Sequence, residues 1–334
     1  MFIAALRPFL LVPALCGALT LASCAPATQS AAGQSSFNQS SSDQSSDSGD
    51  LTPRPAGSPD VLLLAVSGRC PVACQAPGDN IDYLTPRGTV QAVADTLSAR
   101  GLTVESYAVA ANLSEHTPRT IMQAQVGAGK TVPAQQQGFL QLEARLNAAY
   151  NGWIHGRSNP TRIVLLAHSH GVVWTHALAR AHPEVPIAAM IDLDGVCDLW
   201  ETDNRAAVRT YIGQLGHSPW AFDLADSCGS VRVGHIRYDL KDVVFPNVQW
   251  GLEVQSARLL SSSNGNVMAN LPFDSLENVR LDGTRQGLQT YRSAGETHSM
   301  VSRPESQAMA WVKVQLTALS AAWTPTPAPP TADR

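Results

Sequence analysis

An apolar run that ends in a serine is the sequence feature that most limits how this chain can fold. Residues 163–167 are all apolar, which is typical of a strand buried on both faces, and 172–180 have helical character. The residues between them predict a sharp turn with Ser169 at its apex, an arrangement that exposes the hydroxyl of a weak nucleophile. Such a turn is crowded and needs small flanking residues, and Ala167 and Gly171 occupy those positions.

Strands and helices alternate along most of the body of the chain. The predicted strands are 61–66, 103–109, 163–167, 186–192 and 231–237, and the predicted helices are 89–100, 134–153, 172–180 and 304–322. This alternation predicts the α/β class, with a mostly parallel central sheet flanked by helices. Two regions without a strand pattern, 110–133 and 196–230, could form a small cap over the sheet.

Composition excludes several classes of protein. With 44% hydrophobic and 15% charged residues among 334, the chain can bury a large core, which excludes a small disulfide-stapled domain. A net charge of −4 provides no basic surface, so no nucleic-acid partner is expected. The body contains no apolar run of roughly 18 residues, which excludes an integral membrane bundle.

The predicted turn resembles the nucleophile elbow of the α/β-hydrolase superfamily, whose motif is G-x-S-x-G. Here the motif reads A-H-S-H-G, so Ala167 replaces the first glycine. The resemblance implies an α/β-hydrolase domain over 59–323 and a lipase- or esterase-like serine hydrolase without a cofactor. It also implies that Ser169 is the nucleophile and that the substrates are small-molecule or lipid esters.

His298 matches the superfamily's catalytic histidine, because it lies in a loop directly before the predicted last helix. In that role it would take the proton from Ser169 and later deliver it to the leaving group.

The resemblance favours Asp242 as the acid of the triad. This residue follows the predicted strand 231–237, with Val244 and Pro246 completing a D-x-V-x-P-like context that the superfamily often has after a late strand. A carboxylate in this place would hold the tautomer of the imidazole and stabilise the imidazolium.

Three other carboxylates stay open as the acid. Asp192 and Asp194 follow the predicted strand 186–192, and some relatives place the acid after such an earlier strand. Both could equally be a pair that caps a loop. Asp239 is the third alternative, because it lies close to Asp242.

The oxyanion hole of the superfamily takes two backbone N–H groups. One is expected from His170, which follows the nucleophile. The other is expected from the loop after strand 61–66, either from Gly68 or from Arg69. His168 and His170 flank the serine, but no Cys or Glu completes a metal-binding spacing, so no metal is expected.

The two ends of the chain are predicted to lie outside the fold. Residues 1–23 resemble a bacterial lipoprotein signal peptide, and LASC before and at Cys24 resembles a lipobox. This implies export to the bacterial cell envelope, either periplasmic or surface-facing, with a lipid on Cys24 as the membrane anchor. The Ser-rich segment 24–58 and the Pro-rich tail 324–334 are expected to be disordered.

Four cysteines in the body are expected to form disulfides, because an even number in an exported chain favours them. Proximity in the sequence favours Cys70–Cys74 and Cys197–Cys228, while the two other pairings stay open.

Two classes of function are consistent with the sequence. One is the serine hydrolase, whose machinery also serves thioesterases, polyester depolymerases, amidases and acyltransferases. The other is a non-catalytic envelope lipoprotein that uses the same scaffold to bind partners. The sequence indicates no oligomeric state.

Overall fold

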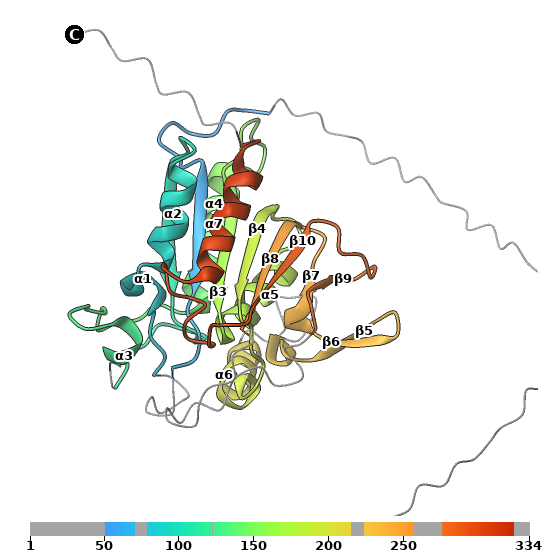
Figure 1. Ribbon diagram of the computed structural model, residues 1–334. Helices are drawn as coiled ribbons and strands as arrows, with labels where there is room; N and C mark the ends of the chain where they lie inside the picture. The colour runs from blue at the N-terminus through green and yellow to red at the C-terminus, as the bar shows by residue number, and fades with distance from the viewer. Residues whose placement is uncertain are drawn as a thin grey trace, which may run out of the picture. The chain divides into compact units, whose positions relative to one another are not determined.

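Strands that are far apart in the chain lie side by side in one parallel sheet (Figure 1). The computed structural model describes residues 51–70, 79–119, 121, 123–214, 224–256 and 276–323. Within them the main sheet has six strands in the order β10-β8-β4-β3-β1-β2, and every neighbouring pair is parallel. The strands are β1 Val61–Val66, β2 Val104–Val109, β3 Arg162–His168, β4 Ile187–Leu193, β8 Val248–Ser256 and β10 Leu288–Ser293.

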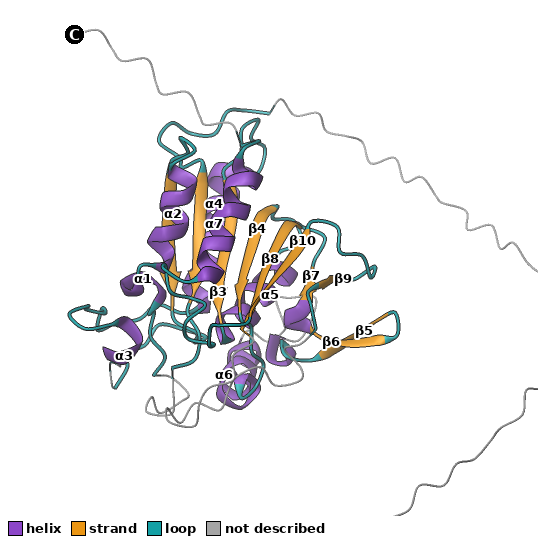
Figure 2. Ribbon diagram, viewed as in Figure 1, coloured by secondary structure: helices purple, strands orange, loops and turns teal. Residues whose placement is uncertain are grey.

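Helices cover both faces of the sheet (Figure 2). On one face α4 and α5 pack against Leu62 and Leu64 of β1, and on the other face α2 and α7 pack against Val61 and Leu63. Burial on both faces is the reason that β1 is apolar at every position. The helices are α1 Leu84–Arg87, α2 Thr89–Ser98, α3 Gln123–Val126, α4 Phe139–Ala149, α5 His170–Ala181, α6 Trp200–Gln214 and α7 Gln307–Ser320. The predicted α/β class is therefore confirmed.

The predicted strand 231–237 is wrong as a member of the main sheet. The segment forms an antiparallel hairpin of β5 (Ser230–Val233) and β6 (Ile236–Asp239), which projects beyond the sheet in Figure 1. Gly234 has a φ of 60°, which lets the chain reverse tightly there. The strand that pairs with β4 is instead β8. A second small sheet pairs β7 (Val243–Val244) with β9 (Val279–Arg280).

The folded chain extends beyond the predicted start at residue 59. Thr52 forms a bridge with Arg157, and the guanidinium of Arg54 pairs with the Asp60 carboxylate in a buried position. At the other end Trp323 is buried. The predicted signal peptide, Cys24 and the tail 324–334 lie outside the described residues. None of the helices in the described ranges has the length and apolar character needed to span a membrane.

Gly171 marks the closest approach between α5 and the sheet. A Cβ atom at this position would lie 2.2 Å from the Val66 carbonyl oxygen and 3.0 Å from the Ser67 carbonyl oxygen. Both are backbone atoms at the end of β1, so they cannot move away without disturbing the sheet. The start of α5 can contact β1 only through a residue without a side chain.

We therefore expect Gly171→Ala to lower the free energy of unfolding by about 2 kcal/mol or more, because of overpacking against β1. Gly152→Ala is the matched control, since nothing lies within 4 Å of a Cβ there, and its effect should stay within about 1 kcal/mol. Urea unfolding of both variants measures the difference. Equal stability of the two variants would contradict the assigned contact.

Candidate active site

The carboxyl ends of the parallel strands meet at one edge of the sheet, where open α/β sheets bind their ligands. The segment after β1 carries Gly68, the turn after β3 carries Ser169, and the segment after β4 carries Asp194. The loop after β10 carries His298. Four segments that are distant in the sequence thus supply groups to one place.

Ser169 lies in a strained turn between β3 and α5. Its φ is 59° and its ψ is −129°, a combination rarely adopted by a residue with a side chain. Its N–H donates to the Leu193 carbonyl oxygen at 3.1 Å, which ties the turn to the end of β4. A Cβ at Gly68 would lie 2.3 Å from the Ser169 Cβ. The segment after β1 therefore needs a glycine where it contacts the serine turn. The predicted sharp turn is therefore present.

His298 contacts Asp194. Its Nδ1–H donates to Asp194 Oδ2 at 2.7 Å, and the Asp194 carboxylate is buried. Ser256 at the end of β8 also donates to this carboxylate, through its N–H at 2.8 Å and its hydroxyl at 2.6 Å. Asp194 itself has a φ of 54°, a second strained backbone position. Three donors and a strained backbone thus hold one carboxylate against the imidazole.

The His298 ring lies beside the serine turn. Its centroid is 4.6 Å from that of His168, the residue before Ser169. Within the described chain the Ser169 hydroxyl and the His298 ring make no direct hydrogen bond. The two residues therefore lie on adjoining segments, and a hydrogen bond between them requires a movement of their side chains.

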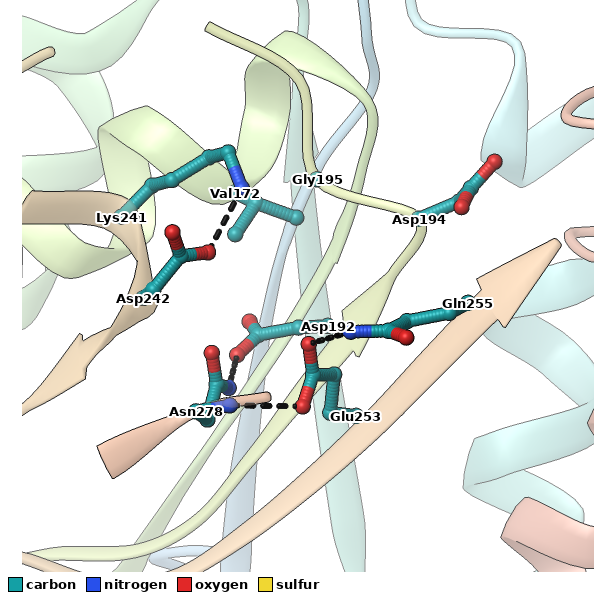
Figure 3. A pocket seen from close by; sticks show the side chains of 9 residues that line it. All are labelled: Val172, Asp192, Asp194, Gly195, Lys241, Asp242, Glu253, Gln255 and Asn278. Carbon is teal, nitrogen blue, oxygen red and sulfur yellow. Dashed lines mark hydrogen bonds and ion pairs between the residues drawn. The ribbon is translucent and has the colours of Figure 1, made fainter. Parts of the chain in front are cut away.

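Asp242, the acid favoured from the sequence, does not contact His298. It is buried at the end of a short 3₁₀ turn and pairs with Lys241 Nζ at 2.6 Å. In Figure 3 the Asp194 carboxylate points away from this ion pair. The strand before Asp242 belongs to the β5–β6 hairpin, outside the main sheet, so Asp242 does not follow a strand that ends beside Ser169 and His298. Asp239, where burial raises the pKa, ends that same hairpin.

Asp192 contacts His176 and Asn278 and not His298. Its Oδ2 accepts from His176 Nε2 at 2.9 Å and from Asn278 Nδ2 at 2.8 Å. His176 Nδ1 faces the Val243 carbonyl oxygen at 3.0 Å, so both ring nitrogens donate. Burial lowers the pKa of His176, but the Asp192 carboxylate more than offsets this, and the net pKa is raised. Asp192 and His176 therefore form a buried ion pair. Asp192 also lines a small polar cavity (Figure 3).

The three N–H groups expected to bind an oxyanion differ in whether they already have an acceptor. The His170 N–H belongs to the first turn of α5 and has no partner within that helix. The Gly68 N–H already donates to the Tyr83 hydroxyl at 2.8 Å, so Gly68 is excluded as a free donor. In the described chain the Arg69 N–H has no acceptor, while the Arg69 side chain pairs with Asp203 of α6.

The His168 and His170 rings point to separate partners. His168 Nε2 lies 2.7 Å from the His298 carbonyl oxygen, and His170 Nε2 lies 2.6 Å from that of Asp198. Burial lowers the pKa of His170 to about 3, so this ring is neutral. In the part of the chain that the structure describes, no three His, Cys, Asp or Glu side chains are grouped to hold a metal.

The segment after Asp194 is held down by a disulfide. Cys197 bonds Cys228, which confirms the predicted pair and links the segment to the residues before β5. The His170 ring and the Ser169 carbonyl oxygen hold the same segment through Asp198 and Val196. Cys70 is also disulfide-bonded, and its predicted partner, Cys74, lies outside the described residues.

Three residues that support the site were not predicted. Ser256 holds Asp194, Tyr83 contacts Gly68 and His168, and Glu296 accepts from the N–H groups of Gln307 and Ala308 at the start of α7. Glu296 has no capping signal in the sequence, because it lies eleven residues before Gln307 and the N-cap of α7 is Ser306. Ser256 and Tyr83 depend on contacts between distant segments.

The neutral His170 predicts a pH dependence of stability. Its folded pKa lies below the ordinary 6.5, so its contribution to stability is complete above pH 6.5 and is lost as the pH falls. Between pH 7 and pH 5 this loss is about 2 kcal/mol. His170→Gln, which keeps a donor for Asp198, should reduce the decrease in unfolding free energy over this range by that amount. The exposed His235→Gln should leave the decrease unchanged, and the same slope in H170Q and wild type would contradict the assignment.

Comparisons with known proteins find similarity among solved structures only, since no family model and no curated protein match the sequence. The chain is similar to the esterase domain of a Rhodothermus marinus protein, with 14% identity, a TM-score of 0.37, and 80% and 89% of the two chains covered. It is also similar to Est1E from Butyrivibrio proteoclasticus, with 12% identity, a TM-score of 0.34, and 80% and 91% covered. It is similar as well to the RedJ thioesterase from Streptomyces coelicolor, with 12% identity, a TM-score of 0.37, and 80% and 93% of the two chains covered. The chemistry of this chain rests on the geometry of its own site.

Proposed function

We propose that the protein is a serine hydrolase that cleaves carboxylic esters through an acyl-enzyme on Ser169. The observation that carries this proposal is the 2.7 Å contact between His298 Nδ1 and Asp194 Oδ2, beside the strained turn that holds Ser169. A nucleophile, a base and a group that orients the base are the three parts that such catalysis needs.

In the proposed reaction the Ser169 hydroxyl turns toward His298 Nε2 and attacks the ester carbonyl. His298 takes the hydroxyl proton as the new bond forms and donates it to the leaving alcohol. Asp194 accepts the Nδ1–H, which fixes the tautomer that leaves Nε2 free and stabilises the imidazolium. Water then attacks the acyl-enzyme with the same assistance and releases the acid.

Negative charge on the carbonyl oxygen would be stabilised by the N–H groups of His170 and Arg69. Both N–H groups lack an acceptor in the described chain, and His170 begins α5, whose N-terminus carries a partial positive charge. Preorganised donors of this kind stabilise the transition state more than the substrate.

We propose small-molecule or lipid esters as substrates and an exported, lipid-anchored location through Cys24. The lipobox-like residues before Cys24 support the anchor. The Cys197–Cys228 bond supports folding in an oxidising compartment.

Ser169→Ala removes the nucleophile and tests the proposal directly. We expect kcat/KM for a p-nitrophenyl ester to fall by about 10⁴-fold or more, because no acyl-enzyme can form. A fluorophosphonate probe should label the wild type and not this variant, while circular dichroism confirms that both are folded. Labelling or hydrolysis at the wild-type level in S169A would refute the proposal.

Asp194→Asn and Asp242→Asn separate the two candidate acids. Asn at 194 cannot stabilise the imidazolium, so kcat should fall by about 10³–10⁴-fold. Asn at 242 removes the charge that compensates the buried Lys241 ammonium, which should lower the unfolding free energy by about 3–5 kcal/mol, while the folded protein keeps most of its kcat. The opposite ranking of kcat, measured per labelled active site, would restore Asp242 as the acid.

A further inference from the structure

Two segments on either side of Ser169 must keep a fixed separation for the proposed reaction. One contains Gly68 and Arg69 after β1, and the other contains His298 after β10. Neither segment is a helix or a strand, so the sheet alone does not fix their positions. A misplacement of about 1 Å can reduce a rate by about 100-fold.

A chain of hydrogen bonds connects these two segments through the residue before the nucleophile. The Gly68 N–H contacts the Tyr83 hydroxyl at 2.8 Å, and this hydroxyl contacts His168 Nδ1. On the other side of the ring, His168 Nε2 contacts the His298 carbonyl oxygen at 2.7 Å. Tyr83 and His168 are both buried.

The direction of every bond in this chain is determined. A carbonyl oxygen can only accept, so His168 Nε2 carries a proton and donates it to His298. Burial holds the pKa of His168 well below its ordinary value, so the ring is neutral and Nδ1 accepts. Burial also raises the pKa of Tyr83 to about 12, so its hydroxyl keeps the proton that Nδ1 requires. The hydroxyl oxygen then accepts from Gly68.

Arg87 fixes Tyr83 and the His298 loop together. Its guanidinium lies 4.6 Å from the centre of the Tyr83 ring. The same guanidinium donates to the Ser302 hydroxyl and the Ser299 carbonyl oxygen, in the residues that follow His298. Arg87 thus links the ring face of Tyr83 to the same loop that the Tyr83 hydroxyl reaches through His168.

We propose that Tyr83 and His168 are positioning residues, which hold the Gly68-Arg69 segment and His298 at a fixed separation across Ser169. Neither side chain needs to touch the substrate. The inference rests on the proposed function and adds to it two side chains outside the triad and the oxyanion hole.

Variants of the two residues break different parts of the chain. Tyr83→Phe removes the hydroxyl and thus both of its bonds. His168→Gln keeps a donor for the His298 carbonyl oxygen and loses the acceptor for Tyr83, whereas His168→Asn keeps the acceptor and loses the donor. Tyr107→Phe is the matched control, since the Tyr107 hydroxyl has no hydrogen bond within the described chain.

We expect Tyr83→Phe to lower kcat for a p-nitrophenyl ester by about 10- to 100-fold with little change in KM. His168→Asn should impair kcat more than His168→Gln, because only Gln can rescue the contact to His298. The double variant Y83F/H168Q should be no slower than Y83F, since both single changes break the same bond. Rates are counted per site titrated with fluorophosphonate, so a loss of folded protein does not affect them.

Three results would overturn the inference: wild-type kcat in Y83F, equal kcat in H168N and H168Q, or a double variant slowed by the product of the single effects. A purely structural role would lower the unfolding free energy and leave kcat per titrated site unchanged. If Y83F does not fold, the ranking of H168Q and H168N decides.

A nitrogen NMR measurement separates the failure of this inference from that of the proposed function. In the wild type, the ¹⁵N shifts of His168 should show a protonated Nε2 and an unprotonated Nδ1. A protein without esterase activity but with this signature would refute the proposed function and support the chain of hydrogen bonds through Tyr83 and His168. An active enzyme with His168 protonated at Nδ1 would refute this chain of hydrogen bonds and leave the proposed function standing.

Discussion

The backbone strain at Ser169 is the constraint on which the rest of the site depends. A residue with a side chain at positive φ costs about 1–3 kcal/mol and persists only where its surroundings hold it. Here the surroundings are two buried strands and a helix that leave no space for side chains at Gly68 and Gly171. The same close packing brings the end of β1 and the start of α5 to the serine, so Ser169 and its neighbouring N–H groups are positioned by one set of contacts.

Elements that are buried on both sides could be predicted from the sequence. The strands β1, β3 and β4 are nearly continuous apolar runs because helices cover both faces of the sheet. The turn at Ser169 was recognisable for the same reason, since a strand of this kind leads directly into it. His298 could be located because it lies between the last strand and α7.

Elements that supply polar groups to the site could not be predicted in this way. In β8 the side chains of Glu253 and Gln255 are buried but polar; Glu253 accepts from the Asn278 N–H and from the Gln255 side chain. This removes the apolar pattern from a central strand, and β10 is polar for most of its length. With β8 unrecognised, the hairpin before Asp242 took the place of β8 in the predicted topology, and this placement is why the sequence favoured Asp242 over Asp194. Tyr83 escaped prediction because its role depends on Gly68 and His168, which only the folded chain brings together.

The disulfide between Cys197 and Cys228 has a practical consequence. It fastens the stretch between Asp194 and α6, the same stretch that the His170 ring touches through Asp198. A thiol reagent added to keep a preparation soluble would therefore act on the neighbourhood of the carboxylate that faces His298. Protein from a reducing cytoplasm and protein from an oxidising expression host would be different samples, and their specific activities should be compared only after the thiols have been counted.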